Sequence, residues 1–400
     1  MSRSELPKDW RIASLEDVAD FINGYSFKST DWDISGLPII RIQNLNDGSK
    51  PFNRFSAEID EKYRVRSGDV LISWSASLGA YFWEGGDAWL NQHIFKAVIN
   101  ENTIDRDFFF WVMKNRIDKI AESARGSTMK HVTRKTFINS TIPLPPLPEQ
   151  RAIARALRAV QGAREARLRE MALERERKAA LMEHLFACDS WNIAPLEKCA
   201  FVQTGVTKGR KFENGNNIIK MPYLRVANVQ DGYLDLEEIQ TIEIRESELE
   251  RFLLQPGDIL LTEGGDFDKL GRGFIWQGQI PQCVHQNHIF AVRVDKDRLI
   301  PEYLAYLIQS EYGKAYFLSV AHRTTHLACI NSTKLKAFPT LIPDLAEQKR
   351  IVDVLAACDS KIAALDHEAR LHDELFQAML EELMSGRLPV GGAGGGRGLS

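Results

Sequence analysis

The sequence predicts an α+β protein built from two tandem-repeated, β-rich domains, each followed by a long helix. Three observations support this fold class. A set of motifs recurs in the same order in both halves, short apolar runs alternate with Gly, Pro, Asn and Asp, and two long segments are rich in helix-forming residues. A chain of 400 residues is long enough for two or more domains with their own cores.

The internal repeat comprises five blocks, and each copy spans about 190 residues, a usual size for a domain with an appended element. The pairs are, in order, WRIASLEDVADFINGYSFK from Trp10 with WNIAPLEKCAFVQTGVTK from Trp191, LPIIRIQNLNDGS with MPYLRVANVQDGY, SGDVLIS with PGDILLT, NQHIF with QNHIF, and PLPPLPEQRAI with LIPDLAEQKRI. The stretches between the blocks differ in sequence and length. A shared framework with divergent connections is therefore expected.

Within each domain, the apolar runs predict strands and one helix. The predicted strands are IIRIQNL (39–45), DVLISW (69–74) and HIFKAVI (93–99) in the first copy, and YLRVANV (223–229), DILLT (258–262) and HIFAVRV (288–294) in the second. FFFWVMKNRIDKIAESA (108–124) and PEYLAYLIQSEYGKAYFL (301–318) each predict a helix, because their apolar residues recur near helical spacing.

Segments 149–187 and 347–387 each predict a single long helix, since neither contains proline and both are rich in Ala, Leu, Glu and Arg. Prolines just before each segment and a glutamate in its first turn are typical helix-start signals. The second segment also has a heptad seam, formed by Ile351, Leu355, Cys358, Ile362, Leu365, Ala369, His372, Phe376, Met379 and Leu383. The first is a poorer heptad, with arginines midway.

The charges of the two segments favour pairing them with each other. The first carries nine Lys or Arg against six Asp or Glu, and the second carries five against nine. The alternative is that each helix packs separately, on its own domain or on another protein. The resulting expected boundaries are domain 1 over 1–146, a central helix over 147–189, domain 2 over 190–344, a C-terminal helix over 345–388 and a flexible tail over 389–400.

Composition limits the class of protein. The chain is 44% hydrophobic and 26% charged, as expected for an ordinary globular protein, and no stretch approaches the roughly 20 apolar residues of a membrane span. Five scattered cysteines without a CxxC motif, and an N-terminus without a signal peptide, favour reduced thiols and a cytoplasmic location. The net charge of −3 does not itself indicate nucleic-acid binding, so any DNA contact requires locally concentrated basic residues or another subunit.

The sequence contains no catalytic constellation that we can identify. There is no Walker-type loop and no GxGxxG motif. PDLAEQK (343–349) superficially resembles a nuclease signature, but its repeat mate lacks the aspartate and the lysine, so we interpret both copies as helix starts. His322 and His326 have a spacing that could bind zinc, yet the mate has no histidine pair. His93 and His288 recur in both halves and are more typical of framework residues than of catalysts. We therefore predict neither an enzyme nor a metal site, but a recognition scaffold that reads through its loops.

The chain resembles the specificity subunit of type I restriction–modification enzymes over about 390 residues. The residues that carry the resemblance are the openings at Trp10 and Trp191, the GDVL and GDIL blocks, and the PLPPLPEQ turn into a long helix. The second copy departs from the pattern at Asp344 and Ala346, where the first has prolines.

The resemblance implies that each β-rich domain is a target-recognition domain for one half of a bipartite, asymmetric DNA site. It implies that the long helices form an antiparallel coiled coil with pseudo-twofold symmetry, and that the chain itself is non-catalytic and holds no cofactor. The implied partners are double-stranded DNA, two S-adenosylmethionine-dependent methyltransferase subunits, and two motor–nuclease subunits that use ATP and Mg.

Candidate DNA contacts follow from residue type, because Arg, Lys, Ser, Thr and Asn commonly contact phosphates and base edges. Two loops directly upstream of the helix exits supply most of them, and further basic residues follow the first block of each repeat. The candidates are Lys28, Arg125, Ser127, Thr128, Lys130, His131, Lys208, Arg210, Lys211, Arg272, Arg323, Thr324, Thr325 and His326. Arg41, Asn44, Arg225 and Asn228 recur in both halves and are predicted to belong to the framework.

A rival hypothesis is a duplicated coiled-coil scaffold that assembles other proteins without touching DNA. Loops 125–131 and 322–326 on one basic face would favour DNA recognition, whereas loops that face apart would favour the scaffold.

Overall fold

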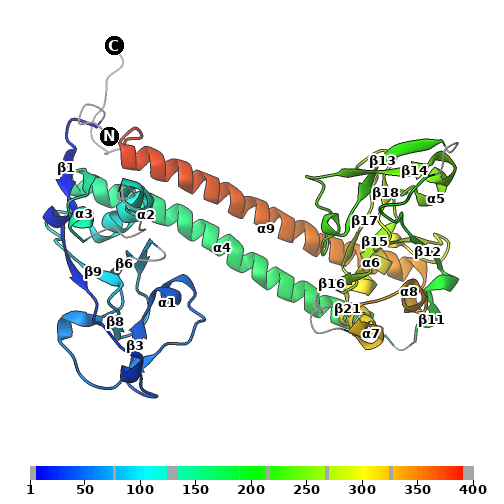
Figure 1. Ribbon diagram of the computed structural model, residues 1–400, viewed down its shortest axis with the longest axis horizontal. Helices are drawn as coiled ribbons and strands as arrows, with labels where there is room; N and C mark the ends of the chain where they lie inside the picture. The colour runs from blue at the N-terminus through cyan, green and yellow to red at the C-terminus, as the bar shows by residue number, and fades with distance from the viewer. Residues whose placement is uncertain are drawn as a thin grey trace, which may run out of the picture. The chain divides into compact units, whose positions relative to one another are not determined.

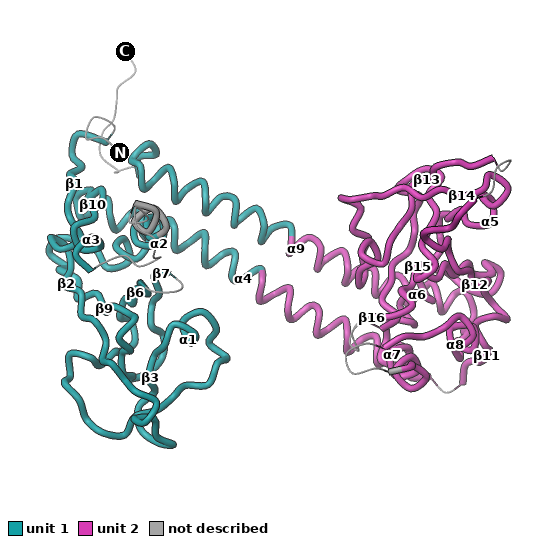
Figure 2. The backbone as a smooth tube through the Cα atoms, viewed as in Figure 1, with its two compact units in different colours: residues 1–167, 367–400 teal, residues 168–366 magenta. Residues whose placement is uncertain are grey.

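The computed structural model describes residues 6–74, 78–123, 134–188, 190–212, 217–265, 270–323 and 328–390. The chain forms two compact units, residues 1–167 with 367–400 and residues 168–366 (Figure 2). The first unit contains the first repeat and the second unit contains the second repeat. Because the division passes through both long helices, each unit contains half of each helix.

Unit 1 is built on two four-stranded sheets and a two-stranded ribbon (Figure 1). The first four-stranded sheet has the order β2 (Ala19–Asn23), β9 (Ile94–Ile99), β6 (Val70–Ser73) and β7 (Gly79–Phe82). The second has the order β4 (Arg54–Phe55), β3 (Leu37–Ile40), β8 (Ala88–Leu90) and β5 (Arg64–Val65). The ribbon pairs β1 (Arg11–Ser14) with β10 (Thr141–Leu144). Its short helices are α1 (Ile42–Asn46), α2 (Arg106–Ser123) and α3 (Arg134–Ile138).

Unit 2 repeats most of this plan. Its first sheet has the order β12 (Ala200–Thr204), β19 (Ile289–Val294), β15 (Ile259–Thr262) and β17 (Gly273–Ile275), as in unit 1. Its second sheet has three strands, β14 (Gln240–Arg245), β13 (Ile218–Leu224) and β18 (Val284–His285), where unit 1 has four. The ribbon is β11 (Asn192–Pro195) with β22 (Pro339–Ile342), and a small fourth sheet joins β16 (Gly264–Gly265), β21 (Ala328–Cys329) and β20 (His322–Arg323). The helices are α5 (Leu249–Phe252), α6 (Pro301–Gln309), α7 (Glu311–Val320) and α8 (Ser332–Lys336). The predicted duplication of an α+β domain is thus confirmed.

The predicted strands 39–45 and 223–229 are wrong in their second halves. The chain leaves β3 at Ile40 and β13 at Leu224, then turns into α1 and into a 3₁₀ turn over Val226–Asn228. In both copies the asparagine side chain causes this change. Asn44 Oδ1 accepts a hydrogen bond from the Arg41 amide at 3.2 Å, and Asn228 Oδ1 accepts one from the Arg225 amide at 2.8 Å. Such local side-chain caps compete with strand pairing.

The predicted helix 301–318 is also wrong as a single element, because it breaks at Ser310 into α6 and α7. Ser310 has an extended backbone and caps α7, its hydroxyl oxygen accepting a hydrogen bond from the Gly313 amide at 3.3 Å. The same hydroxyl donates to the Leu307 carbonyl at 2.6 Å, which ends α6. Helical periodicity is preserved across the break, so the apolar pattern alone does not reveal it.

The long helices are α4 (Leu147–Phe186) and α9 (Leu345–Ser385), and they pair within each unit as predicted. In unit 1, Arg164 Nε lies 3.2 Å from Asp373 Oδ1, and Arg167 Nε lies 3.3 Å from Glu368 Oε2. In unit 2, Lys178 Nζ lies 2.5 Å from Asp359 Oδ1. In these ion pairs, the residue number on α9 falls as the residue number on α4 rises, so the two helices are antiparallel. Most of the ion pairs join a basic residue of α4 to an acidic residue of α9.

A glutamine locks the start of each long helix to its domain. Gln150 Oε1 accepts a hydrogen bond from the Asp105 amide at 2.7 Å, and its Nε2 donates to the carbonyls of Thr103 and Pro145. Gln348 makes the equivalent three bonds to Ile300, Arg298 and Pro343. Both side chains are buried. The repeated Glu-Gln sequence is therefore both a helix start and a clamp.

Each unit closes its core with residues from both long helices. The core of unit 1 includes Leu157 of α4, and Phe376, Leu380 and Leu383 near the end of the chain. The ring centroid of Phe376 lies 5.3 Å from that of Trp111 on α2. The core of unit 2 includes Met182 and Phe186 of α4 with Ile351, Val352 and Leu355 of α9.

None of the helices within the described ranges combines the length and apolar character that crossing a membrane requires. All five cysteines are free, and Cys199, Cys283 and Cys358 are buried.

Candidate nucleic-acid interface

Much of the predicted contact set falls outside the described residues. This applies to Arg125, Ser127, Thr128, Lys130 and His131 of the first loop, and to Thr324, Thr325 and His326 of the second. Arg323 lies in β20, but its side chain is outside the described part. His322 lies in the same strand and not in a helix. The zinc pair with His326 depended on helical spacing, so that argument does not apply to His322.

The base of the second loop is described and is well ordered by hydrogen bonds. Strands β20 and β21, which flank residues 324–327, pair with each other, and β21 also pairs with β16. The Ile330 amide donates to the Glu263 carbonyl at 2.8 Å. Glu263 Oε2 in turn lies 2.5 Å from Nδ1 of His288, the repeated histidine. The predicted loop therefore emerges beside this repeated histidine.

Lys28, Lys208 and Lys211 have exposed side chains, as a phosphate contact requires. Lys28 is the last residue of the first block and precedes a 3₁₀ turn, where its amide donates to Asp31 Oδ2 at 2.7 Å. This bond fixes the backbone and leaves the ammonium group in solvent.

Arg210 and Arg272 have partners inside the protein. Arg210 Nη2 donates to Glu248 Oε1 at 2.8 Å, and its guanidinium lies 5.6 Å from the centre of the Phe212 ring. The bond from Arg210 lowers the pKa of the Glu248 carboxyl. Arg272 Nη1 donates to Gln230 Oε1 at 3.4 Å. These two arginines are weaker candidates for DNA contacts than the exposed lysines.

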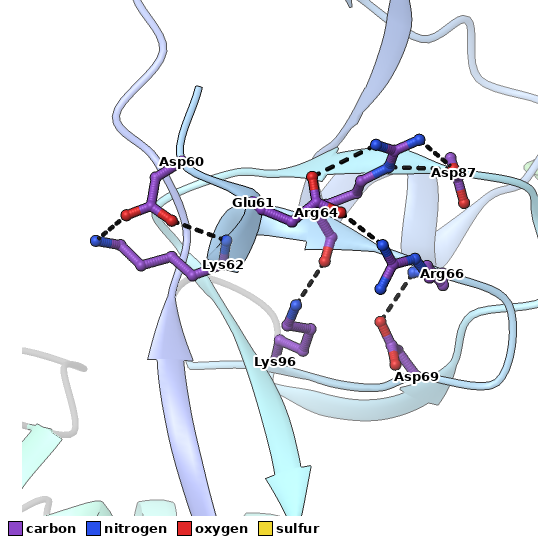
Figure 3. Close-up of polar contacts among 8 residues, drawn as sticks. All are labelled: Asp60, Glu61, Lys62, Arg64, Arg66, Asp69, Asp87 and Lys96. Carbon is purple, nitrogen blue, oxygen red and sulfur yellow. Dashed lines mark hydrogen bonds and ion pairs between the residues drawn. The ribbon is translucent and has the colours of Figure 1, made fainter. Parts of the chain in front are cut away.

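Several other basic residues of unit 1 are neutralised internally (Figure 3). Arg64 donates to Asp87 at 2.5 Å, and this bond raises the pKa of the guanidinium. Arg66 lies 2.5 Å from Glu61. Lys96 Nζ donates to the Arg64 carbonyl at 2.5 Å, and burial lowers the pKa of its ammonium group. Since these charges already have partners, this cluster is not a phosphate-binding patch.

Sequence reasoning missed basic residues on the short helices that follow the two loops. In α3, Arg134 and Lys135 are exposed, and Arg134 Nη2 donates to the Phe21 carbonyl at 3.2 Å. In α8, Lys334 is exposed and Lys336 is half-buried. The sequence does contain a signal, which is a pair of basic residues shortly before the proline-containing start of each long helix. Arg134 and Lys135 are adjacent, and Lys334 and Lys336 are separated by one residue.

The repeated asparagines are framework residues, as predicted. Asn44 and Asn228 are buried, and their amide nitrogens donate to carbonyls of the following turn, Lys50 and Pro51 in one copy and Asp235 and Glu238 in the other. The acidic helix start is confirmed as well, since Asp344 Oδ1 accepts a hydrogen bond from the Glu347 amide at 2.8 Å. In the described part of the chain, no three His, Cys, Asp or Glu side chains form a group that could hold a metal ion.

Comparison with known proteins identifies the duplicated domain. A family model described as "Type I restriction modification DNA specificity domain" matches residues 7–171 and, a second time, residues 200–371. The specificity subunit of the type I restriction enzyme EcoKI from Escherichia coli K12 is 25% identical, with 97% of this chain and 91% of the relative covered. That of MjaVIII from Methanocaldococcus jannaschii is 23% identical, with coverage of 96% and 94%.

Solved structures agree on the fold. The S subunit of a type I restriction–modification system from M. genitalium superposes with a TM-score of 0.58 at 15% identity, with 95% of this chain and 98% of that chain covered. A chain from a type I restriction–modification assembly superposes with a TM-score of 0.59 at 18% identity, with coverage of 96% and 99%. Because the family model matches well over half of the sequence, in two copies, the chain belongs to the type I restriction–modification DNA specificity domain family.

Proposed function

We propose that this chain is the DNA-recognition subunit of a type I restriction–modification complex, and that it reads a bipartite, asymmetric site with one unit on each half. The observation that carries this proposal is the duplication. Two units share their sheet order and framework, match the same specificity-domain model, and differ in the loops between shared strands. Shared frameworks provide equivalent docking, and different loops provide different base contacts.

The chain acts without chemistry of its own in this proposal. Two methyltransferase subunits that use S-adenosylmethionine modify adenine, and two motor–nuclease subunits use ATP and Mg. The target base must leave the stack to be methylated, and the methyltransferase performs that step. Cofactors therefore belong to the partners. Since the substrate is the cell's DNA, the complex works in the cytoplasm.

Mapping the methylated adenines tests the proposal. The full chain, co-expressed with its methyltransferase subunits, is expected to methylate DNA only at a two-part site with a fixed gap. A complex that assembles but neither binds nor methylates a defined site would support the rival hypothesis of a protein scaffold without DNA contact.

A second test concerns the predicted loops. Changing Arg125, Lys130 and Arg323 to alanine should weaken DNA binding and lower the slope of log K against log salt concentration by up to about three. The control removes the same charge from lysines that already pair with nearby acids, Lys62, Lys314 and Lys349. Equal affinities for the two triple variants would exclude these loops as phosphate contacts.

A further inference from the structure

Unit 1 contains a cavity of about 320 Å³ whose walls combine aromatic rings with hydrogen-bonding groups. The side chains relevant to its chemistry are Phe27, Trp32, Arg41, Gln43, Gln92 and His93. They come from the loop before β3, from the start of α1 and from the turn between β8 and β9 (Figure 1). Arg41, Gln43, Gln92 and His93 lie in blocks that both repeats share, so this part of the cavity can be compared with the same region of unit 2.

The groups that line this cavity are of the kinds that contact nucleotides. Trp32 is 43% exposed, and the Arg41 guanidinium lies 5.4 Å from the centre of its ring. Arg41 Nη1 donates to Asn53 Oδ1 at 3.1 Å, which fixes the guanidinium in place. Gln43 is exposed, and its side-chain amide makes no hydrogen bond to any described residue. An aromatic ring packs against sugars and apolar base edges, a glutamine amide reads a base edge, and a guanidinium with further N–H groups binds a phosphate.

The turn that carries Trp32 is held firmly. Asp33 Oδ2 accepts hydrogen bonds from the amide and the hydroxyl of Ser56, at 3.0 and 2.5 Å, and these bonds lower the pKa of the Asp33 carboxyl. Arg54 Nη1 donates to the Gly36 carbonyl at 2.8 Å. Ile34, at the tip, is fully exposed. The cavity wall is therefore a braced projection, which is a suitable support for a specific contact.

Comparison of the repeats separates shared from variable positions. Arg41 and His93 recur as Arg225 and His288. At the position of Gln43, unit 2 has Ala227, and Trp32 lies in a stretch between two shared blocks where the copies differ in sequence and length. A side chain that reads sequence must differ between units that read different half-sites, and Gln43 and Trp32 meet that condition.

The repeated histidine is also engaged differently in the two units. Gln92 Nε2 lies 3.3 Å from His93 Nε2, and Asn287 Nδ2 lies 3.4 Å from His288 Nε2, so both rings are approached by an amide. His288 Nδ1 then pairs with Glu263, but the matching residue of unit 1 is Trp74. Among the described residues, no carboxylate pairs with His93. Its Nδ1, the ring nitrogen that Gln92 does not approach, can therefore donate to a phosphate.

The place of the cavity agrees with this use. In unit 2, the Ile330 amide, just after β21, donates to the Glu263 carbonyl, and the Glu263 carboxylate pairs with His288. In unit 1, the Trp74 amide donates to the His93 carbonyl at 3.4 Å, which places the matching strand end beside the cavity. The cavity thus lies at the strand end that corresponds to the described base of the second loop in unit 2.

We propose that this cavity contacts one nucleotide of the half-site read by unit 1, with Trp32 packed against its sugar and base edge, Gln43 bonded to the base edge, and the phosphate held by Arg41 and His93. The inference rests on the proposed function and adds the residues that make it specific.

The test uses the full chain assembled with its methyltransferase subunits. Trp32→Ala, Gln43→Ala and a control, Gln277→Ala, are compared, since Gln277 is an exposed glutamine in unit 2 outside the cavity. The readouts are the methylated sequence in a random-sequence DNA library and the Kd for a duplex carrying the wild-type site. Melting curves confirm folding, which is expected to persist because both replaced side chains are exposed.

Trp32→Ala and Gln43→Ala are expected to raise the Kd between about five- and a hundredfold and to relax the sequence of one half-site only. The control should leave both half-sites unchanged. Variants that fold and methylate the wild-type sequence with wild-type affinity would overturn the cavity proposal. Failure of the wild-type complex to methylate any defined site would instead overturn the proposed function.

Discussion

At the scale of single residues, the repeated Glu-Gln pair shows what sequence can and cannot predict. The glutamate is an expected helix-start residue, and the structure confirms the start of each helix within two residues. The role of the glutamine was not predictable. Gln150 bonds a backbone 45 residues earlier and Gln348 one 48 residues earlier. No local pattern reports contacts at that separation.

Replacing Gln150 with alanine is expected to destabilise unit 1 by about 2–3 kcal/mol, because a buried amide and two carbonyls lose their partner. Urea denaturation followed by tryptophan fluorescence measures the change. Gln277→Ala, at an exposed position, should shift the midpoint by little. Equal midpoints for the two variants would contradict the clamp.

The repeated glycines Gly24 and Gly205 have a steric explanation. A Cβ at Gly24 would lie 2.2 Å from the Asn91 carbonyl oxygen, and one at Gly205 would lie 2.0 Å from the His285 carbonyl oxygen. In both units, the backbone just after β2 or its counterpart β12 passes against the segment that leads to the repeated histidine. Sequence shows that these glycines recur, whereas the close approach is visible only in three dimensions.

Gly24→Ala is accordingly expected to push the 90–93 turn away and to cost about 1–3 kcal/mol. Methylation should become less specific at the half-site read by unit 1. Gly48→Ala is a suitable control, since no atom lies within 4 Å of a Cβ there. Similar methylation patterns for both variants would show that the turn tolerates displacement.

At the scale of elements, charge and periodicity predicted that the long helices pair, but not how their seam is composed. Glu174 has a nearly buried side chain and lies 3.0 Å from Lys361 Nζ. In this pair the acid is on α4 and the base is on α9, the reverse of most α4–α9 ion pairs. Lys178 and Asp359 meet nearby, and Asp359 also accepts a hydrogen bond from Tyr306 at 2.7 Å. Heptad rules favour apolar seams, so an ionic section is invisible to them.

The ionic section predicts a pH dependence. The hydrogen bond from Lys361 lowers the pKa of Glu174 from its ordinary value of 4.5. A lowered pKa in the folded state contributes stability above about pH 4.5, and this contribution disappears as pH falls through the lower value. Wild type should therefore exceed Glu174→Gln in urea midpoint at pH 7, and the gap should close toward pH 3.

Glu176→Gln supplies the control, because Glu176 is exposed on the same helix. Its midpoint should follow wild type at all pH values. A gap between wild type and Glu174→Gln that stays constant from pH 7 to pH 3 would mean that the lysine contact contributes nothing specific to the folded state.

At the scale of the whole molecule, the repeat was enough to predict two α+β units with paired helices. It did not predict which loops form surfaces that could contact DNA. The cavity at Trp32 and Gln43 combines residues from three separated stretches, and the stretch that carries Trp32 lies in a region that the repeats do not share. Divergent loops have no internal template, and their geometry depends on the specific side chains that brace them.

Because α4 and α9 continue without a break from one unit into the other, we expect their length to set the gap in the DNA site. Four residues inserted at the middle of α4, with four at the facing position of α9, add about 6 Å and slightly more than one turn to each helix. The unread gap should lengthen by about two base pairs. Methylation mapping measures this, and an unchanged gap would exclude a measuring role for the helices.

The closure of unit 1 by Phe376, Leu380 and Leu383 has a consequence for how the protein is made. The ribosome synthesises most of unit 1 first, yet that unit lacks part of its core until residues 376–383 have emerged. Unit 2, by contrast, is one continuous segment, 168–366, and is complete earlier. A chain terminated before Phe376 would carry one finished unit and one with an open apolar face, so that only chains that extend past Leu383 would be competent to recognise both parts of a target.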